Sequence, residues 1–332
     1  MSGELSLLIL AAGKGKRLLS QRVKVLHELC GQPVLEYLLQ ALAPLKAQRT
    51  IVIIGHQAEQ VRARFEGRRL IFVEQLEQLG TGHAALQARP ALEDRGGEIL
   101  ILPGDLPLLR TELLEEFLAF HRAHGRRLSL LTMEPEDRAG YGRIVRDREG
   151  NVMQIVEEKD ASQEERQIRE VNSGVYLVRN DGLFWEALAA LSAANAQGEY
   201  YLSDIISFYR GRGEAVRALL ARESEWLLGV NSRADLARAE AILRERKLAA
   251  VLAAGATVLA PESVKIDQGV VLEPDTQVGP GTSLKGRSRI GRGAVVEDSV
   301  VEGFQLGEGC RIIGSLLFFK EERGAEADRG QR

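Results

Sequence analysis

Small and basic residues gather in the loop that follows the apolar segment Leu5–Leu10. The loop reads Ala-Ala-Gly-Lys-Gly-Lys-Arg, ends at Arg17 and is followed seven residues later by Lys24. Small residues let backbone N–H groups approach a polyphosphate closely, and the two cations suit a polyphosphate leaving group. A plain tight turn explains a glycine-rich loop about as often. The loop lacks the Gly-Lys-Ser/Thr ending of a kinase P-loop and the third glycine of a dinucleotide fingerprint.

Three polar residues elsewhere offer groups that suit nucleotide and metal binding. Asp105 follows an apolar run and a glycine, so its carboxylate is expected to project into a cleft as a hard oxygen ligand for Mg²⁺. The alternative for Asp105 is a turn or helix-cap aspartate. Gln75 carries the donor and the acceptor that the edge of uracil requires, and is otherwise a surface glutamine. Asn231 has a neutral amide oxygen, although on its own the N-cap of a helix is the simpler explanation.

Short apolar runs indicate which elements position these residues. Leu5–Leu10, 50–55 and 99–102 are typical of buried strands, and residues 33–42 are expected to form a helix. Alternating strands and helices predict an α/β sheet with helices on both faces. Ligands of such sheets bind beyond the carboxyl ends of the strands, so the residues just after the first and third runs are expected to carry the chemistry.

The composition excludes several other classes of protein. The 332 residues, 45% of them hydrophobic, can bury the core of one large domain plus a smaller one. The net charge of -3 offers no basic field to a nucleic acid, and no apolar run reaches the about 18 residues of a membrane span, so neither partner is expected. Two distant cysteines, Cys30 and Cys310, and a start without a leader pattern indicate a cytoplasmic protein with buried, apolar thiols.

The five histidines show no metal-ligand spacing that repeats with acidic partners. His121 and His124 are expected to be solvated on one helix. His83, inside a Gly-Thr-Gly-His segment, is the histidine that bears on a uracil site.

The texture of the sequence changes from residue 232 onward. Residues 232–255 are rich in alanine and arginine and are expected to form a linker helix that stops at Gly255. Aliphatic residues then recur at every sixth position, which predicts a β-solenoid rather than an ordinary β-meander, with a register slip of one near Val301. Residues 319–332 are polar and are expected to form a disordered tail. The repeating positions are Ile266, Leu272, Val278, Leu284, Ile290 and Val296, followed by Leu306 and Ile312.

A set of segments in a fixed order narrows the function. The loop after Leu10, with its downstream lysine, resembles the signature of the sugar nucleotidyltransferases. The whole set resembles the uridylyltransferase half of the bacterial bifunctional N-acetylglucosamine-1-phosphate uridyltransferase family, over residues 5–235. The other segments are Glu77-Gln-Leu-Gly-Thr-Gly-His83, Pro103-Gly-Asp105-Leu-Pro-Leu, Gly140-Tyr-Gly-Arg-Ile144, Val156-Glu-Glu-Lys-Asp160, Val171-Asn-Ser-Gly174, Gln197-Gly-Glu-Tyr-Tyr-Leu-Ser-Asp204 and Gly229-Val-Asn231.

This resemblance implies both a fold and a reaction. The fold is a Rossmann-like nucleotidyltransferase domain over residues 1–231, the linker helix over 232–255, and a short left-handed parallel β-helix of hexapeptide repeats over 256–318. The reaction joins UTP to N-acetylglucosamine-1-phosphate and releases pyrophosphate and UDP-N-acetylglucosamine, a peptidoglycan precursor. Mg²⁺ is the implied cofactor, held by Asp105 and Asn231.

The resemblance also implies roles for individual residues. The catalytic residues are Arg17, Lys24 and Asp105, of which the two cations would stabilise the departing pyrophosphate. Tyr200, Tyr201 and Asp204 are expected to be scaffold. The implied substrate-binding residues are Leu10, Ala11, Ala12, Gly13, Lys24, Gly104, Asp105 and Asn231 around the nucleotide and metal, Gln75, Gly80 and Thr81 at uracil, and Gly142, Glu157 and Asn172 at the sugar and its N-acetyl group.

The chain departs from the family pattern in its second half. The bifunctional members continue into a longer β-helix with an acetyl-CoA-dependent acetyltransferase site, whereas this solenoid stops near Leu317 after about three coils, so acetyl transfer is not predicted. The relatives' trimers suggest a homotrimer through the β-helix. Lys16 stands where the family usually has threonine, and Pro103 where some members have an aromatic residue.

Two competing functions stay open at this point. One is a nucleotidyltransferase for a different sugar phosphate or base, because the shape of the pocket cannot be seen in a sequence. The other is a catalytically silent scaffold or regulatory subunit, which the intact set of Arg17, Lys24, Asp105 and Asn231 disfavours.

Overall fold

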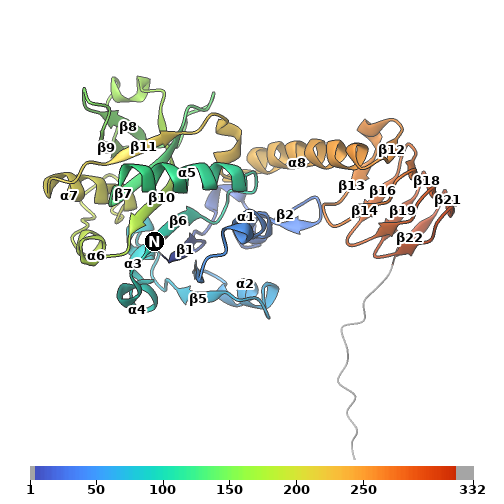
Figure 1. The fold of residues 1–332 in the computed structure, drawn as a ribbon, viewed down its shortest axis with the longest axis horizontal. Coiled ribbons are helices and arrows are strands. Elements are labelled where there is room, and N and C mark those ends of the chain that lie inside the picture. Colours follow the sequence, from blue (N-terminus) through green and yellow to red (C-terminus); the bar gives the residue numbers. More distant parts are fainter. Residues whose placement is uncertain (1–3, 319–332) are drawn as a thin grey trace, which may run out of the picture. The chain divides into compact units, whose positions relative to one another are not determined.

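The computed structural model describes residues 4–318, and their contacts divide the chain into two compact units (Figure 1). The first unit contains the described residues through His27 together with Pro33–Leu236. The second contains Glu28–Gln32 and the residues from Ala237 onward. The predicted disordered tail, 319–332, lies outside the described residues.

Within its described residues the first unit is built on a nine-stranded mixed sheet with the path β11-β7-β10-β6-β1-β4-β5. β1 pairs in parallel with β4 and β6, whereas β10 runs antiparallel to β6 and β7. A hairpin, β8–β9, branches from the start of β10. The strands are β1 (Leu5–Leu10), β4 (Arg49–Ile54), β5 (Ile71–Glu74), β6 (Glu98–Pro103), β7 (Leu128–Met133), β8 (Arg143–Arg146), β9 (Val152–Val156), β10 (Val171–Arg179) and β11 (Arg217–Leu220).

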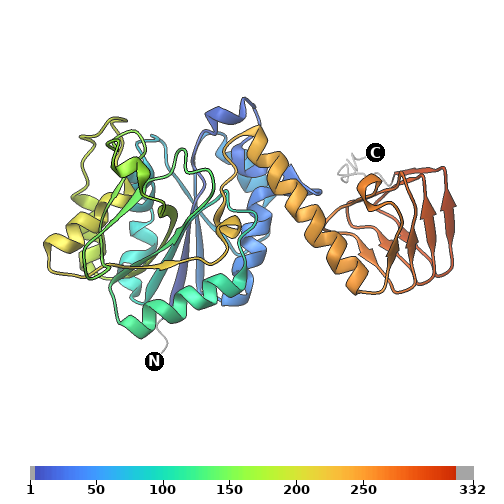
Figure 2. The same cartoon turned by 90° about the horizontal axis from the view of Figure 1, so that it is seen from above.

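Helices cover both faces of this sheet (Figure 2). Leu7 and Ile9 of β1 belong to the core cluster that α1 and α5 complete, and Leu8 between them belongs to the cluster on the opposite face with α3, α6 and α7. A strand buried on both faces can hold few polar residues, which is why a nearly continuous apolar run predicts it. The helices are α1 (Val34–Leu42), α2 (Ala58–Arg64), α3 (Thr81–Leu86), α4 (Arg89–Leu92), α5 (Thr111–His124), α6 (Gly182–Ala189) and α7 (Ile205–Gly211).

The predicted α/β sheet with helices on both faces is therefore confirmed. The three apolar runs are β1, β4 and β6, and the helix expected over residues 33–42 is α1. The carboxyl ends of β1 and β6 are neighbours, because Leu10 pairs with Pro103 in a parallel ladder.

The expectation that His121 is solvated was wrong. Its side chain is 3% exposed, and its Nδ1 lies 2.9 Å from the hydroxyl of Ser129. His121 follows the buried Leu114 and Phe117 at helical spacing on α5, so it shares their inward face. Burial lowers the pKa of His121 to about 4. His124, in the last turn of the same helix, is exposed as expected.

We expect His121 to make the protein sensitive to acid. The pKa of its folded state, about 4, lies below the ordinary 6.5, so the unfolded chain binds the proton first as the pH falls. The resulting stabilisation is complete above about pH 6.5, is lost between about pH 6.5 and 4, and amounts to at most about 3 kcal/mol of unfolding free energy. Urea unfolding at neutral and acidic pH measures it.

The matched control for this prediction is His124→Gln, an exposed histidine in the same helical turn. His121→Gln should lose less unfolding free energy between neutral and acidic pH than the wild type, and His124→Gln should lose as much as the wild type. An identical acid dependence in His121→Gln and the wild type would contradict the assignment.

Helix α8 (Arg233–Ala253) begins in the last residues of the first unit and continues into the second. Its first turn is held by a capping box, in which the Asp235 N–H donates to Ser232 Oγ at 3.2 Å and the Ser232 N–H donates to Asp235 Oδ2 at 2.8 Å. Gly255 follows the helix with φ of 92°, a left-handed conformation that suits glycine after a helix end. Ser232, and not Asn231, is thus the N-cap residue.

The second unit stacks short parallel strands in three sheets, as predicted for a left-handed β-helix. All six aliphatic residues from Ile266 to Val296 that recur at every sixth position are buried. The sheets follow the orders β12-β15-β18-β21, β13-β16-β19-β22 and β14-β17-β20. The strands are β12 (Thr257–Val258), β13 (Lys265–Ile266), β14 (Val271–Leu272), β15 (Gln277–Val278), β16 (Ser283–Lys285), β17 (Arg289–Ile290), β18 (Val295–Glu297), β19 (Val300–Glu302), β20 (Gln305–Leu306), β21 (Arg311–Ile313) and β22 (Leu316–Phe318).

The coils shorten along the β-helix. Val278 pairs with Val296, 18 residues later, whereas Val296 pairs with Ile312 after only 16. The predicted slip of one residue at Val301 is therefore the first of two, because Leu306 follows Val301 after five residues as well. Buried hydroxyls close the turns between strands, as where Thr276 donates to the carbonyl of Glu273 at 2.6 Å.

Residues 28–32 belong to the second unit although the sequence places them inside the first domain. They form the strands β2 (Glu28–Leu29) and β3 (Gln32–Pro33) around a turn. The carbonyl of Cys30 accepts a hydrogen bond from the Gln268 N–H at 3.0 Å, and its thiol lies 3.9 Å from the carbonyl of Glu240. Burial raises the pKa of this thiol to about 11, in keeping with the apolar role predicted for it.

Candidate functional site

The loops that follow β1 and β6 pack directly against each other. The Gly104 N–H donates to the carbonyl of Leu10 at 2.9 Å, and a β-carbon on Gly104 would lie 2.9 Å from that of Ala11. Ala11 and Ala12 are buried, whereas Gly13 is exposed with no atom within 4 Å of a β-carbon there. Only glycine at position 104 allows the close contact with Ala11. The predicted nucleotide loop is therefore closely packed where it begins and is exposed to solvent at Gly13.

Lys24, Asp105 and Asn231 meet in one cluster. The Lys24 ammonium donates to Asn231 Oδ1 at 2.8 Å and forms an ion pair with Asp105 Oδ2. The backbones are tied as well, because the Val230 N–H donates to the carbonyl of Asp105 at 2.9 Å. The capping box of α8 leaves the Asn231 side chain free for Lys24. The structure thus joins three predicted residues from distant parts of the chain.

The Asp105 and Asn231 oxygens converge on one cation, the Lys24 ammonium. Carboxylate and amide oxygens are also the ligands that Mg²⁺ prefers, so the pair fits a divalent metal. A β-carbon at Gly229 would lie 3.4 Å from Asp105 Oδ2, and its absence keeps the space beside the carboxylate open. The described residues contain no cluster of three or more His, Cys, Asp or Glu suited to a metal. The remaining ligands here would be substrate phosphates and water, as is usual for Mg²⁺.

Tyr141 closes the cluster and was not predicted as a site residue. Burial raises the pKa of its hydroxyl, which is hydrogen-bonded to the backbone of Gly229 and lies in the field of Asp105. Arg17 is exposed, and its Nη1 lies 3.6 Å from where a β-carbon of Gly140 would be. The sequence did contain a signal for Tyr141, because the segment Gly140-Tyr-Gly belongs to the ordered set of family motifs. Arg17 therefore faces the loop that carries Tyr141.

Gln75 lies at the carboxyl end of β5 and is 3% exposed, so it is not a surface glutamine. Its amide nitrogen donates to the carbonyl of Gly80 at 3.0 Å and lies 3.0 Å from His83 Nδ1. The other ring nitrogen of His83 lies 3.1 Å from the side-chain amide of Gln87. In the tautomer in which His83 Nδ1 is the acceptor, both donor hydrogens of Gln75 are engaged. Its oxygen is left to accept a hydrogen bond, and His83 holds the amide in that orientation.

Gly80 and Thr81 bind the segment that contains the two tyrosines predicted as scaffold. Gly80 has φ of 113°, and a β-carbon there would lie 2.6 Å from the carbonyl of Tyr200. The hydroxyl of Thr81 accepts a hydrogen bond from the Leu202 N–H at 3.0 Å. The side chain of Tyr201 is 7% exposed, which fits that scaffold role. This segment therefore packs against the turn that holds Gln75.

The three residues predicted at the sugar also lie together. A β-carbon on Gly142 would lie 3.3 Å from Glu157 Oε1, and the Asn172 N–H donates to the carbonyl of Gly142 at 2.8 Å. Ser203 donates to Glu157 Oε1 at 3.0 Å. Burial raises the pKa of Glu157, and the nearby Asp204 carboxylate adds to the shift. These residues form a small polar group around a partly desolvated carboxyl group.

Contacts link the three groups into one continuous site. A β-carbon at Gly174, two residues after Asn172, would lie 2.8 Å from the ring of Pro103, two residues before Asp105. A β-carbon at Gly55 would lie 2.7 Å from the carbonyl of Ala12. The pair Asp105 and Asn231, predicted to hold the metal (the metal pair), therefore adjoins the group of Gly142, Glu157 and Asn172 predicted at the sugar (the sugar group). The loop after β1 adjoins the strand next to Gln75. The site follows the carboxyl ends of β1, β4, β5 and β6, as expected for an open α/β sheet.

Comparisons with known proteins agree with this geometry. The MobA-like NTP transferase domain matches residues 7–258. A bifunctional protein GlmU from Pelobacter propionicus is 43% identical over 319 residues, which are 95% of this chain and 69% of the relative. The chain belongs to the GlmU family. A second member, from Pelotomaculum thermopropionicum, is 42% identical over 337 residues, or 96% of this chain and 73% of its own.

Membership in the GlmU family makes this protein a sugar-1-phosphate nucleotidyltransferase that transfers a uridylyl group. Enzymes of this type depend on a divalent metal, which suits the Asp105 and Asn231 oxygens. A solved structure titled as UDP-glucose pyrophosphorylase complexed with UDP-glucose has the same fold, with a TM-score of 0.61 and 16% identity over 73% of this chain and 99% of that one. Among the described residues no helix is both long and apolar enough to cross a membrane.

Proposed function

We propose that this enzyme joins UTP to N-acetylglucosamine-1-phosphate, with Mg²⁺ as its metal, and releases pyrophosphate and UDP-N-acetylglucosamine. The observation that carries the choice of sugar is the group of Gly142, Glu157 and Asn172 beside the metal pair. A buried carboxylate accepts hydrogen bonds from sugar hydroxyls, and an amide side chain can both donate to and accept from an N-acetyl group. The product would serve peptidoglycan synthesis.

The reaction needs positioning and charge more than proton transfer. A phosphomonoester carries close to two negative charges at neutral pH, so its oxygen is nucleophilic without a general base. Bound Mg²⁺ would neutralise charge on the reacting phosphates. Lys24 presents a second cation at the same oxygens, and Arg17 presents a third from the exposed loop. Together these groups align the acceptor with the α-phosphorus and stabilise the departing pyrophosphate.

Gln75 is expected to select uracil. Because its amide nitrogen is engaged by Gly80 and His83, its oxygen can accept from the N3–H of uracil, whereas cytosine has no hydrogen there. Gln75→Ala should raise the KM for UTP about tenfold, the effect of one lost hydrogen bond, and should reduce the preference for UTP over CTP. Steady-state kinetics with both nucleotides measure this.

Gln87→Ala provides the matched control, because Gln87 contacts the other nitrogen of the same histidine. This variant should keep the KM for UTP within about twofold of the wild type, a change too small for a lost hydrogen bond. An unchanged nucleotide preference in Gln75→Ala would remove Gln75 from base recognition.

We also propose that acetyl transfer is not an activity of this chain. All predicted site residues lie in the first unit. In the described coils the buried side chains are aliphatic, apart from hydroxyls such as Thr276 and Ser288 that donate to backbone carbonyls and close the turns. Such hydroxyls are structural groups. The cytoplasmic location and the homotrimer stay predictions, which cell fractionation and sedimentation can test.

The deciding experiment measures pyrophosphate release from UTP and Mg²⁺ with three acceptors: N-acetylglucosamine-1-phosphate, glucose-1-phosphate and glucosamine-1-phosphate. Acetyl-CoA consumption is followed in parallel. Rapid release with the N-acetylated sugar and no use of acetyl-CoA is expected. Faster release with another sugar would overturn the proposed substrate, and acetyl-CoA consumption would overturn the single activity. No release with any sugar would favour the alternative of a catalytically silent scaffold or regulatory subunit.

A further inference from the structure

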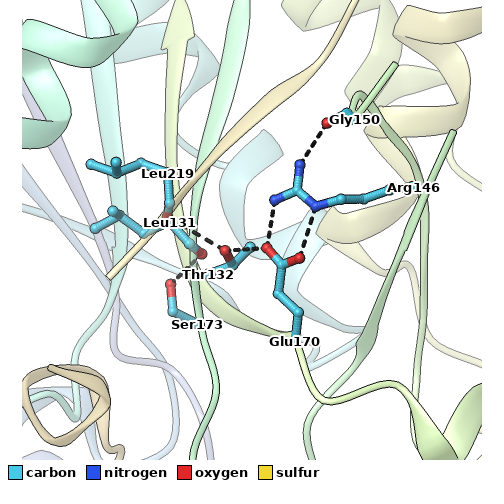
Figure 3. Close-up of polar contacts among 7 residues, drawn as sticks. All are labelled: Leu131, Thr132, Arg146, Gly150, Glu170, Ser173 and Leu219. Atoms are coloured by element: carbon cyan, nitrogen blue, oxygen red, sulfur yellow. Dashed lines mark hydrogen bonds and ion pairs between the residues drawn. The ribbon is translucent and has the colours of Figure 1, made fainter. Parts of the chain in front are cut away.

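The carboxylate of Glu170 joins three strands at one point (Figure 3). Arg146 on β8 donates from Nε to Oε2 at 2.7 Å and from Nη2 to Oε1 at 2.5 Å. The Thr132 hydroxyl on β7 donates to Oε1 at 2.5 Å, and Arg146 reaches the carbonyl of Gly150 at 2.7 Å. Thr132 is fully buried and the Glu170 side chain is 15% exposed. A bidentate, partly buried contact of this kind fixes geometry more strictly than a surface ion pair.

Glu170 stands immediately before the part of β10 that serves the site. Val171 pairs with β7 on one side and with β8 on the other, and Asn172 pairs with Thr132. The register then shifts through an irregularity between Asn172 and Tyr176. Thr132 therefore pairs with Asn172 in the ladder, and its hydroxyl also binds Glu170. Asn172 and Glu170 are thus both held in place by β7.

The β8–β9 hairpin carries the other half of the sugar group. Gly142 precedes β8 and Glu157 follows β9. Two backbone hydrogen bonds attach the hairpin to β10: the Ile144 N–H donates to the carbonyl of Glu170 at 3.0 Å, and the Asn172 N–H donates to that of Gly142 at 2.8 Å. This attachment is short for an element that carries two site residues.

Apolar packing alone does not fix where the hairpin sits along β10. Ile144, Val152 and Ile155 hold its inner side to the core, but hydrophobic attraction is non-directional. A slip of one residue would move every side chain of the hairpin to the opposite face. The two hydrogen bonds from Arg146 to Glu170 supply the directional contact that the apolar side chains lack.

We propose that Glu170 and Arg146 are positioning residues for the sugar side of the site. They set the register between the hairpin and β10, and thereby the place of Glu157 relative to Asn172. This inference rests on the proposed function, in which Glu157 and Asn172 contact the sugar. Glu170 and Arg146 act through those two residues and belong neither to the metal pair nor to the group of Gln75, Gly80 and Thr81 proposed at uracil.

The test is the KM for each substrate in Glu170→Gln and Arg146→Lys. Both variants should raise the KM for the sugar-1-phosphate about tenfold, because a displacement of a binding group by a fraction of an ångström suffices for such a loss. The KM for UTP should stay within about twofold. If Glu170→Gln does not fold, Arg146→Lys and Thr132→Val give the same readout with the carboxylate kept.

Glu98→Gln is the matched control. Glu98 is the first residue of β6, much as Glu170 lies next to the start of β10, and its side chain is also 15% exposed. It accepts hydrogen bonds from Arg122 Nε at 3.0 Å and from Arg122 Nη2 at 2.6 Å. Its loss should lower the melting temperature without changing either KM. An unchanged sugar KM in the Glu170 and Arg146 variants, or an equal rise in Glu98→Gln, would overturn the inference. The comparison uses whichever sugar-1-phosphate the wild type accepts, so a wrong sugar would overturn the proposed function and not this inference.

Discussion

Replacement of Asp105 by alanine is expected to lower kcat about 10²- to 10³-fold while leaving the fold intact, by analogy with the loss of one group that stabilises a transition state. Asp105 supplies the charged member of the oxygen pair that would hold Mg²⁺, and Asn231 alone is a neutral, weaker ligand. The side chain is 13% exposed and lies outside both apolar core clusters of the first unit, so its removal deletes no core contact. Pyrophosphate release measures kcat, and thermal unfolding confirms the fold.

Asp181→Ala is the control for this variant. Asp181 is also an aspartate with a cationic partner, Arg127 at 2.6 Å. It is the N-cap residue of α6 and is not one of the predicted site residues. Its loss should cost about 1 kcal/mol of stability and leave kcat unchanged. Wild-type turnover by Asp105→Ala would remove Asp105 from the mechanism.

Replacement of Lys24 by methionine is expected to lower kcat by a similar factor, about 10² or more. Methionine keeps most of the length of the side chain and its apolar contacts but removes the charge that would stabilise pyrophosphate. Lys24 is 15% exposed and already placed at the metal pair, so no rearrangement is needed to bring its charge there. Single-turnover kinetics with saturating UTP isolate this effect on the chemical step.

Lys247→Met is the matched lysine variant. The Lys247 ammonium is also partly buried between oxygen acceptors, donating to the carbonyls of Gln268 at 3.0 Å and Val270 at 2.6 Å. It belongs to the second unit, so its loss should lower stability and leave kcat near the wild-type value. If both lysine variants lost activity in proportion to their stability, the specific role of Lys24 would be refuted.

The sequence sufficed where a single local pattern decides the structure. Continuous apolar runs predicted β1, β4 and β6, because a strand buried on both faces can hold few polar residues. The six-residue repeat predicted the stacked coils because a short strand buries one aliphatic residue, as at Ile266 and Val278, and exposes its neighbour. Local patterns that were available but unused account for the error at His121 and would have excluded the N-cap alternative for Asn231. His121 has helical spacing from Leu114 and Phe117, and Ser232 with Asp235 forms a capping-box signature.

The sequence predicted which residues belong to the site, but the contacts among those residues could be seen only in the structure. Lys24 and Asn231 are 207 positions apart, and no periodicity relates them. The family resemblance assigned Glu157 and Asn172 to the sugar as a prediction. The contact of Glu170 with Arg146 and Thr132, by contrast, depends on a hairpin that branches from β10. Such contacts follow from topology, which local residue patterns do not specify.

The turn at residues 28–32 has a consequence for how the chain folds during synthesis. Cys30 is made early, but the groups it contacts, Glu240 and Gln268, emerge from the ribosome more than 200 residues later. Contacts of such large sequence separation form slowly, because a long loop must close before they are made. The turn at residues 28–32 must therefore wait for α8 and the first coil of the β-helix. A nascent chain should bind chaperones or be cut by proteases at this turn until that first coil is complete.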